Sequence, residues 1–86
     1  MYKFKKKIKD LTFYAPAKNG KSKYDVYDKN GQFVVSFGSR GYEHYNDKLG
    51  YYSKYNHNDK ERRRLFHARH QNNVGLAGQL SKYYLW

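Results

Sequence analysis

Cysteine is absent from this sequence of 86 residues, and proline occurs once. Without cysteine the chain has no disulfide bonds and no thiolate zinc sites, which is compatible with a reducing compartment. No apolar run approaches the roughly 20 residues that span a bilayer. The N-terminal lysines are not followed by the apolar region of a signal peptide. We therefore expect a protein without a membrane span that stays where it is made.

Acidic residues are also few, because 7 Asp and Glu stand against 18 Lys and Arg, giving a formal net charge of +11. Such a charge attracts nucleic acid, an anionic membrane or an acidic protein surface. Aromatic residues are abundant, with 11 Tyr, 5 Phe and 1 Trp. Tyrosine suits a small core with wet edges, and it is equally typical of protein interfaces.

The clearest helix signal is residues 58–71, NDKERRRLFHARHQ. Asn58 is the predicted N-cap, and Glu61, three residues later, would complete a variant of the capping box. At 100° per residue, Leu65 and Phe66 point toward the core. The opposite face carries four residues that we predict to contact nucleic acid or an acidic partner: Lys60, Arg63, Arg64 and His67. We expect Asn72 to Gly75 to end this helix.

Two further arginines, Arg62 and Arg69, fall on the inward face of the same wheel. A buried guanidinium without a partner is costly, so each needs a carboxylate or main-chain carbonyls. The nearest upstream acids are Glu43 and Asp47. We predict structural ion pairs among these four residues.

Residues 2–8 alternate, with Tyr2, Phe4 and Ile8 on one side and Lys3, Lys5 and Lys7 on the other. This pattern predicts an edge strand whose lysines face solvent and can also contact a polyanion. A disordered basic arm is the alternative. A second short apolar run covers residues 11–14, and a polar, exposed loop is expected at 17–23.

Residues 24–37 are predicted to form a central hairpin. Asn30-Gly31 suits a two-residue type I′ turn, which places Tyr24 opposite Phe37, Val26 opposite Val35 and Tyr27 opposite Val34. A longer, bulged turn that starts at Asp28 is the alternative. The glycines of the following corner, Gly38 and Gly41, suit positive φ.

The rest of the chain predicts a short helical turn at 43–48, an aromatic segment, and a C-terminal helix marked by Leu76, Leu80, Tyr83 and Tyr84. Trp86 is expected to dock on the body of the domain or on a neighbour. The fold class is thus α+β: an antiparallel sheet of three or four strands packed with a basic amphipathic helix and a short C-terminal helix. We expect one domain, 1–86, with a strand-rich part (1–37), an aromatic corner (38–57) and a helical part (58–86).

Four histidines raise the question of a metal site, because His67 and His70 lie one helical turn apart and His57 or Asp59 could join them. Histidines on a cationic helix more often contact phosphate or cap the helix end. No paired carboxylates, phosphate loop or Ser/His/Asp arrangement is evident. We expect no catalysis, no cofactor and no metal.

Several strings together resemble a functionally uncharacterised family of small basic proteins encoded by large nucleocytoplasmic DNA viruses. They are SFG at 36–38, RGYEHY at 40–45, HND at 57–59, RRRLFHARH at 62–70 and YYLW at 83–86. The resemblance covers about the last three-quarters of the chain and implies a location in the virion, with assembly in the host cytoplasm or nucleus. It implies viral capsid or core proteins as partners, with DNA as the other candidate partner.

Two functions are favoured at this point, and a small nuclease, or a subunit of one, is a third alternative. The first is a non-enzymatic structural component of the virus particle, a minor capsid, cement or core protein that binds acidic partner surfaces. The alternative is a nucleic-acid-binding protein without sequence preference, which contacts the phosphate backbone through the lysine-rich strand and the basic helix.

Overall fold

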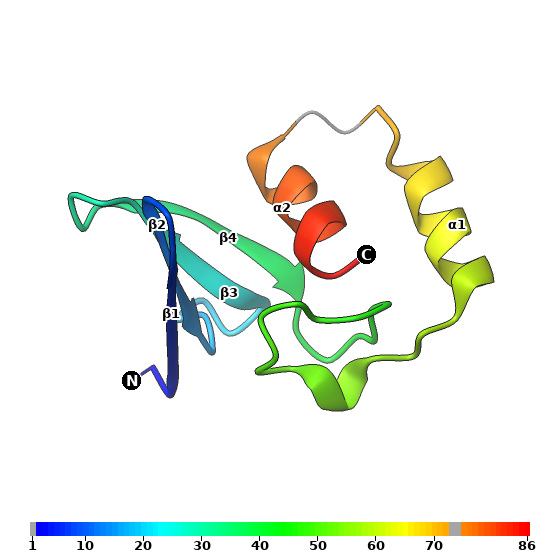
Figure 1. The fold of residues 1–86 in the computed structure, drawn as a ribbon, viewed down its shortest axis with the longest axis horizontal. Helices are drawn as coiled ribbons and strands as arrows, with labels where there is room; N and C mark the ends of the chain where they lie inside the picture. The colour runs from blue at the N-terminus through cyan, green and yellow to red at the C-terminus, as the bar shows by residue number, and fades with distance from the viewer. Residues whose placement is uncertain (1, 73–74) are drawn as a thin grey trace. The chain divides into compact units, whose positions relative to one another are not determined.

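The computed structural model describes residues 2–72 and 75–86. It contains four strands, a short 3-10 helix and two α-helices (Figure 1). The strands form one antiparallel sheet, so the predicted α+β class is confirmed. The chain forms two compact units, Met1–Arg40 and Gly41–Trp86, called here the sheet unit and the helical unit. The expectation of a single domain stays a prediction.

The sheet unit has the strand order β1-β2-β3-β4. Its strands are β1 (Phe4–Ile8), β2 (Leu11–Ala15), β3 (Ser22–Tyr27) and β4 (Phe33–Ser39). The lysine-rich strand β1 lies at one edge of the sheet, as the sequence predicts. The hairpin of β3 and β4 is less central than expected, because β4 forms the other edge.

One face of the sheet carries the buried aromatic residues. Tyr24 pairs with Phe37 and Val26 with Val35, so these two predicted pairs are confirmed. The rings of Tyr24 and Phe37 stack with centroids 5.4 Å apart, and Phe13 meets Phe37 edge-on at 6.1 Å. Four of these side chains are fully buried or nearly so, and that of Val35 is partly exposed. Since side chains alternate along a strand, the intervening residues lie on the opposite face.

The turn between β3 and β4 is the longer, bulged one that starts at Asp28. Asp28 Oδ1 accepts the main-chain N–H of Asn30 at 2.8 Å and that of Gln32 at 3.0 Å, and Gly31 adopts φ 80°. The resulting register shift pairs Tyr27 with Phe33, so the predicted pair with Val34 is wrong. The aspartate side chain caps the turn and favours it over the two-residue type I′ turn.

The segment 17–23 is not an exposed loop throughout, because Ala17 and Lys23 are buried and β3 begins at Ser22. Lys23 is 1% exposed, and its Nζ donates to the main-chain oxygen of Ser39 at 2.7 Å. The Arg40 guanidinium donates to the main-chain oxygens of Ala17 and Ser22. The corner after β4 is therefore tied to the sheet. The two glycines have the positive φ expected, 79° at Gly38, which lies within β4, and 88° at Gly41, which follows the strand.

In the helical unit, the helical turn predicted at 43–48 is wrong. The turn lies instead at η1 (Ser53–Tyr55). The buried Asp47 carboxylate accepts the N–H groups of Leu49 at 2.8 Å and Tyr52 at 2.9 Å. Such side-chain to main-chain bonds compete with helix formation. His44 meanwhile forms an isolated parallel bridge with Asn56.

Helix α1 (Lys60–Arg69) is shorter than the predicted 58–71, and its N-cap is Asp59, not Asn58. Asp59 Oδ1 accepts the N–H of Glu61 at 2.9 Å and that of Arg62 at 3.2 Å. Asn58 has φ 53° and donates from Nδ2 to the Tyr45 oxygen. Its side chain is thus used outside the helix.

Helix α2 (Leu76–Tyr84) is the C-terminal helix that the sequence predicts. Of the segment expected to end the first helix, residues 73 and 74 lie outside the described residues. In the ranges 2–72 and 75–86, neither helix has the length and apolar character needed to cross a membrane.

Candidate functional site

A groove of about 520 Å³ opens on the polar face of the sheet unit, the face opposite Tyr24 and Phe37. We call it the tyrosine groove. Residues from the segment before β1, from β1, β2 and β3, and from the β3–β4 turn line it: Tyr2, Lys5, Lys7, Thr12, Tyr14, Tyr27, Asp28, Lys29 and Gly31.

Strand register brings the lysines of β1 beside the rings of the groove. Lys5 lies opposite Tyr14 and Lys7 opposite Thr12, which in turn pairs with Tyr27. The Lys5 Nζ is 5.9 Å from the centroid of the Tyr14 ring, within the range of a cation–π contact. The predicted solvent face of β1 therefore forms one side of an aromatic groove.

Tyr2 lies on the lysine side of the sheet, although the sequence predicts it beside Phe4 and Ile8. Its ring stacks on Tyr14 with centroids 4.7 Å apart. The chain bends at Lys3, before β1 begins at Phe4, so the alternation of the strand does not extend to Tyr2. Lys3 itself is exposed, and its N–H donates to the Ala15 oxygen at 2.7 Å.

A buried carboxylate holds Tyr2 in place. Asp25, 3% exposed, accepts hydrogen bonds from the hydroxyls of Tyr2 and Ser36 and from the N–H of Lys18 at 3.1 Å. Burial alone raises the pKa of Asp25, but the hydrogen bonds from Ser36, Tyr2 and Lys18 outweigh it and lower this pKa. Asp25 is therefore ionised at neutral pH, with its charge directed at these donors.

The pKa of the Tyr2 hydroxyl is raised, first by burial and then by its hydrogen bonds with Asp25 and Tyr27. The hydroxyls of Tyr2 and Tyr27 lie 3.3 Å apart. The ring of Tyr27 meets Tyr14 edge-on, with centroids 5.3 Å apart and an interplanar angle of 87°. These contacts fix the three rings relative to one another.

The rim of the groove is positively charged. Lys5, Lys7 and Lys29 are exposed, whereas the one acid of the lining, Asp28, accepts main-chain N–H groups within the turn. An anion entering the groove meets lysine side chains beside aromatic rings. Lysine offers an ammonium that contacts phosphate as a point charge.

In the helical unit, the arginines of α1 have partners within the chain. Arg62 Nη1 lies 2.9 Å from Glu43 Oε1, so the predicted ion pair between these residues is present. Both side chains are about half exposed, and the inward position expected for Arg62 is wrong. Of the two acids expected to pair with these arginines, Glu43 pairs with Arg62, whereas Asp47 accepts main-chain N–H groups. Arg69 is exposed in the last turn of α1.

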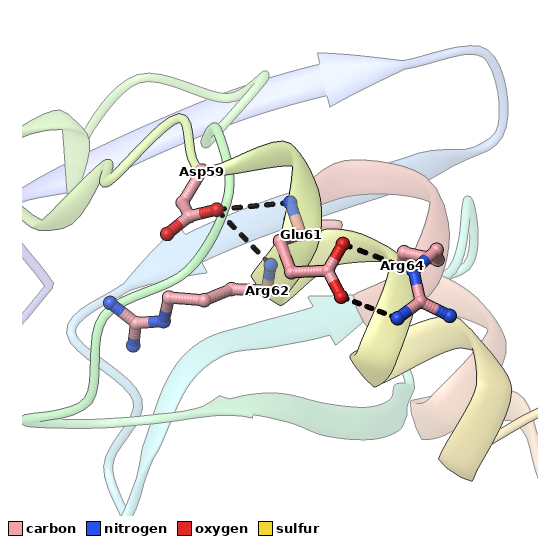
Figure 2. A network of polar contacts seen from close by, with 4 residues as sticks. All are labelled: Asp59, Glu61, Arg62 and Arg64. Atoms are coloured by element: carbon pink, nitrogen blue, oxygen red, sulfur yellow. Dashed lines mark hydrogen bonds and ion pairs between the residues drawn. The ribbon is translucent and has the colours of Figure 1, made fainter.

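Arg64 donates from Nε and Nη2 to the two carboxylate oxygens of Glu61, three residues earlier on the same helix (Figure 2). This hydrogen bonding lowers the pKa of Glu61 and raises that of Arg64. Figure 2 shows the Arg62 side chain extending away from this pair. Since both partners are largely exposed, the ion pair leaves Arg64 accessible to solvent and to a competing anion.

The predicted orientation of α1 is wrong for Arg63 and His67, which turn toward Trp86. Arg63 Nε lies 2.7 Å and His67 Nε2 3.1 Å from the Trp86 main-chain oxygen. Leu65, placed on the inner face by the wheel, is 42% exposed. The reason is that Trp86 stacks on Phe66, which makes the 63-66-67-70 side of the helix the inner one. Lys60 is exposed, as expected.

The histidines of α1 are engaged with main-chain oxygens. His70 Nδ1 lies 2.9 Å from the Phe66 oxygen, and His67 contacts Trp86. In residues 2–72 and 75–86, no three His, Asp or Glu side chains come together in a way that could hold a metal ion. The pKa of His57 is lowered, mainly by burial and further by the charge of Arg62.

Sequence reasoning identified Lys5 and Lys7 but missed the tyrosines beside them and Lys29. The signal was available: the alternation of β1 and β2 about the turn at Lys9-Asp10 places Lys5 opposite Tyr14. The Tyr2–Asp25 contact had no such signal, because it joins residues 23 positions apart.

Comparison with protein-family models, with curated proteins and with solved structures gives no match to this chain. The resemblance to the viral family therefore stays a prediction.

Proposed function

We propose that this protein is a non-enzymatic nucleic-acid-binding protein that contacts the phosphate backbone without sequence preference, through the tyrosine groove of the sheet unit. One observation carries the proposal: three exposed lysines surround the tyrosine rings on a single open sheet face. The formal net charge of +11 supports it, because it adds a long-range attraction for polyanions.

The residue types favour backbone contacts over base readout. Arg, Asn and Gln, whose planar side-chain groups pair with base edges through two hydrogen bonds, are absent from the lining of this groove. Lysine contacts phosphates without a fixed geometry and releases counterions when it does so. On α1, Arg62 and Arg64 already have carboxylate partners. We therefore assign the phosphate contacts to the lysines of the groove before the arginines of α1, although the sequence pointed first to this helix. The contact roles of Lys3, Lys60, Arg63, Arg64 and His67 stay predictions.

The test is a titration of the protein with a fluorescent DNA oligonucleotide at several salt concentrations. The variant Lys5→Gln/Lys7→Gln removes two charges from the groove. Lys6→Gln/Lys21→Gln is its matched control, since it removes two exposed lysines of the same unit that do not line the groove. Each lost phosphate contact lowers the slope of log K against log[salt] by about 0.7 to 0.9.

We expect the groove variant to bind more weakly, and its slope of log K against log[salt] to fall by the amount that corresponds to one or two lost phosphate contacts. The control variant should change little in affinity or in slope. Equal losses in both variants would mean that binding follows overall charge alone. Absence of any salt-dependent DNA binding by the unmodified protein would refute the proposed function.

The second candidate is a structural component of a large DNA virus particle, a minor capsid, cement or core protein, with capsid or core proteins as partners. Two tyrosines of the helical unit favour it, since Tyr42 is 72% and Tyr83 is 62% exposed, and exposed tyrosine is typical of protein interfaces. This proposal also rests on the resemblance, which carries the virion location and the passage through host cytoplasm or nucleus.

A mass-spectrometric inventory of purified particles, before and after removal of their nucleic acid, separates the two candidates. A structural component stays with the empty shells. A protein held by nucleic acid leaves with it, and a protein missing from intact particles refutes the virion location.

A further inference from the structure

We infer that the tyrosine groove selects single-stranded over double-stranded nucleic acid, with a base stacked on the ring of Tyr27. This inference rests on the proposed function and names the form of nucleic acid that the same site takes. It starts from the three tyrosine rings, which phosphate binding alone does not require.

The rings lie where a base can reach them. Tyr14 and Tyr27 are partly exposed, and both line the groove. Tyr2 stacks on Tyr14 at 4.7 Å, whereas Tyr27 is held edge-on by Tyr14 and by Phe33. Neither Tyr14 nor Phe33 stacks parallel to Tyr27, whereas Tyr14 already carries the stacked ring of Tyr2. Tyr27 is therefore the ring best placed to stack with an incoming base.

The charges around Tyr27 match a strand whose phosphates run beside its bases. Lys7 comes from the edge strand, on the far side of Thr12 from Tyr27, and Lys29 comes from the turn that follows Tyr27. A lysine rim with aromatic rings between is the combination that binds single strands without sequence preference. A duplex keeps the faces of its bases stacked inside, so it offers phosphates, sugars and base edges but no base face to stack on Tyr27.

The groove is also held in shape before a ligand arrives. Asp25 fixes Tyr2, Tyr2 contacts the Tyr27 hydroxyl, and Asp28 fixes the turn that carries Lys29. Its volume of about 520 Å³ lies within the roughly 300–1,000 Å³ of small-molecule sites. Preorganised rings reduce the ordering cost of binding.

The experiment compares oligothymidine, oligouridine and duplex DNA of one length over the same series of salt concentrations. Both single strands should bind more tightly than the duplex. The two single strands differ in the 2′-hydroxyl and in the C5 methyl group, so together they show whether the groove takes RNA as well as DNA. Base stacking on an aromatic side chain contributes roughly 1–3 kcal/mol, so we expect Tyr27→Leu to weaken single-strand binding about 5- to 150-fold. Tyr27→Phe keeps the ring and should bind nearly as well as the unmodified protein.

The salt slope distinguishes failure of this inference from failure of the proposed function. Tyr27→Leu should leave the slope unchanged because no lysine is lost. If duplex DNA binds as tightly as oligothymidine with a lysine-dependent slope, the inference is wrong and the proposed function stands. If none of the three probes binds, both are wrong. The comparison on the unmodified protein needs no variant, so it decides the matter even if Tyr27→Leu fails to fold.

Discussion

The indole of Trp86 lies parallel to the ring of Phe66, with centroids 4.3 Å apart and an interplanar angle of 3°. The centroid of the His57 ring lies 5.1 Å from that of Trp86. The His70 ring stacks on Phe66 with centroids 4.1 Å apart. Four aromatic side chains from three segments of the helical unit thus form one row. Arg63 adds a hydrogen bond to the Trp86 main chain. The last residue of the chain is therefore a packing centre for α1.

We predict that Trp86→Ala destabilises the helical unit. Removing a buried Phe or Trp costs about 3–5 kcal/mol, and for this partly exposed indole we expect the lower end of that range. The measurement is urea unfolding followed by far-ultraviolet circular dichroism. Tyr42→Ala is the control, because an exposed site typically changes stability by less than about 0.5 kcal/mol. Equal effects of the two variants would contradict the packing role.

Acid should destabilise the helical unit through His57. Burial, and next the charge of Arg62, lower the pKa of His57 in the folded state. The unfolded chain therefore takes up the proton first, near pH 6.5, and folding stability is full above that pH and falls as the pH drops toward the folded pKa. Urea unfolding between pH 8 and 5 measures this loss. His57→Gln should flatten the profile in this window, and an unchanged profile would refute the assignment.

The sheet unit should lose stability in a separate and more acidic window. The folded pKa of Asp25 is lowered, so its contribution is complete above the unfolded value of about 3.9 and is lost as the pH falls through the folded pKa. Asp25→Asn should remove this dependence. At neutral pH it should also destabilise the unit by roughly 1–3 kcal/mol for each buried donor left unpaired. Ser36→Ala, which removes one donor, should have a smaller effect.

The bulged turn gives a test of backbone conformation alone. Gly31 has φ 80°, and a Cβ added there meets no atom within 4 Å. Gly31→Ala should therefore lower the free energy of unfolding by roughly 1–2 kcal/mol, which is the cost of placing an L residue in the left-handed conformation. Gly31→Asn should cost less, because asparagine tolerates this region. Thermal unfolding of the two variants checks the order, and a larger loss in the asparagine variant would contradict it.

Local patterns were enough to predict most elements of this fold. The pairs Tyr24–Phe37 and Val26–Val35, the edge position of β1 and helix α2 follow from alternation and helical spacing. These signals act over a few residues. The exact turn depended on the Asp28 side chain, which the sequence offered only as an alternative.

Contacts between distant residues were beyond local reasoning. The inner face of α1 is set by Trp86, which lies 20 positions after Phe66 in the sequence. Lys23 was expected to be exposed, like most lysines, yet it is buried with its Nζ on the Ser39 oxygen. In the candidate site the same limit applies, since the Tyr2–Asp25 hydrogen bond joins the segment before β1 to β3.

The edge position of β1 links binding to solubility. Lys5, Lys6 and Lys7 stand in succession on a strand with a single hydrogen-bonded neighbour, and lysines on such an edge repel a second copy that would extend the sheet. Neutralising them one after another would remove this electrostatic barrier as well as the phosphate contacts proposed for Lys5 and Lys7. A chain stripped of these charges should consequently gain a tendency to self-associate through its open strand, visible as a sedimentation coefficient that rises with protein concentration.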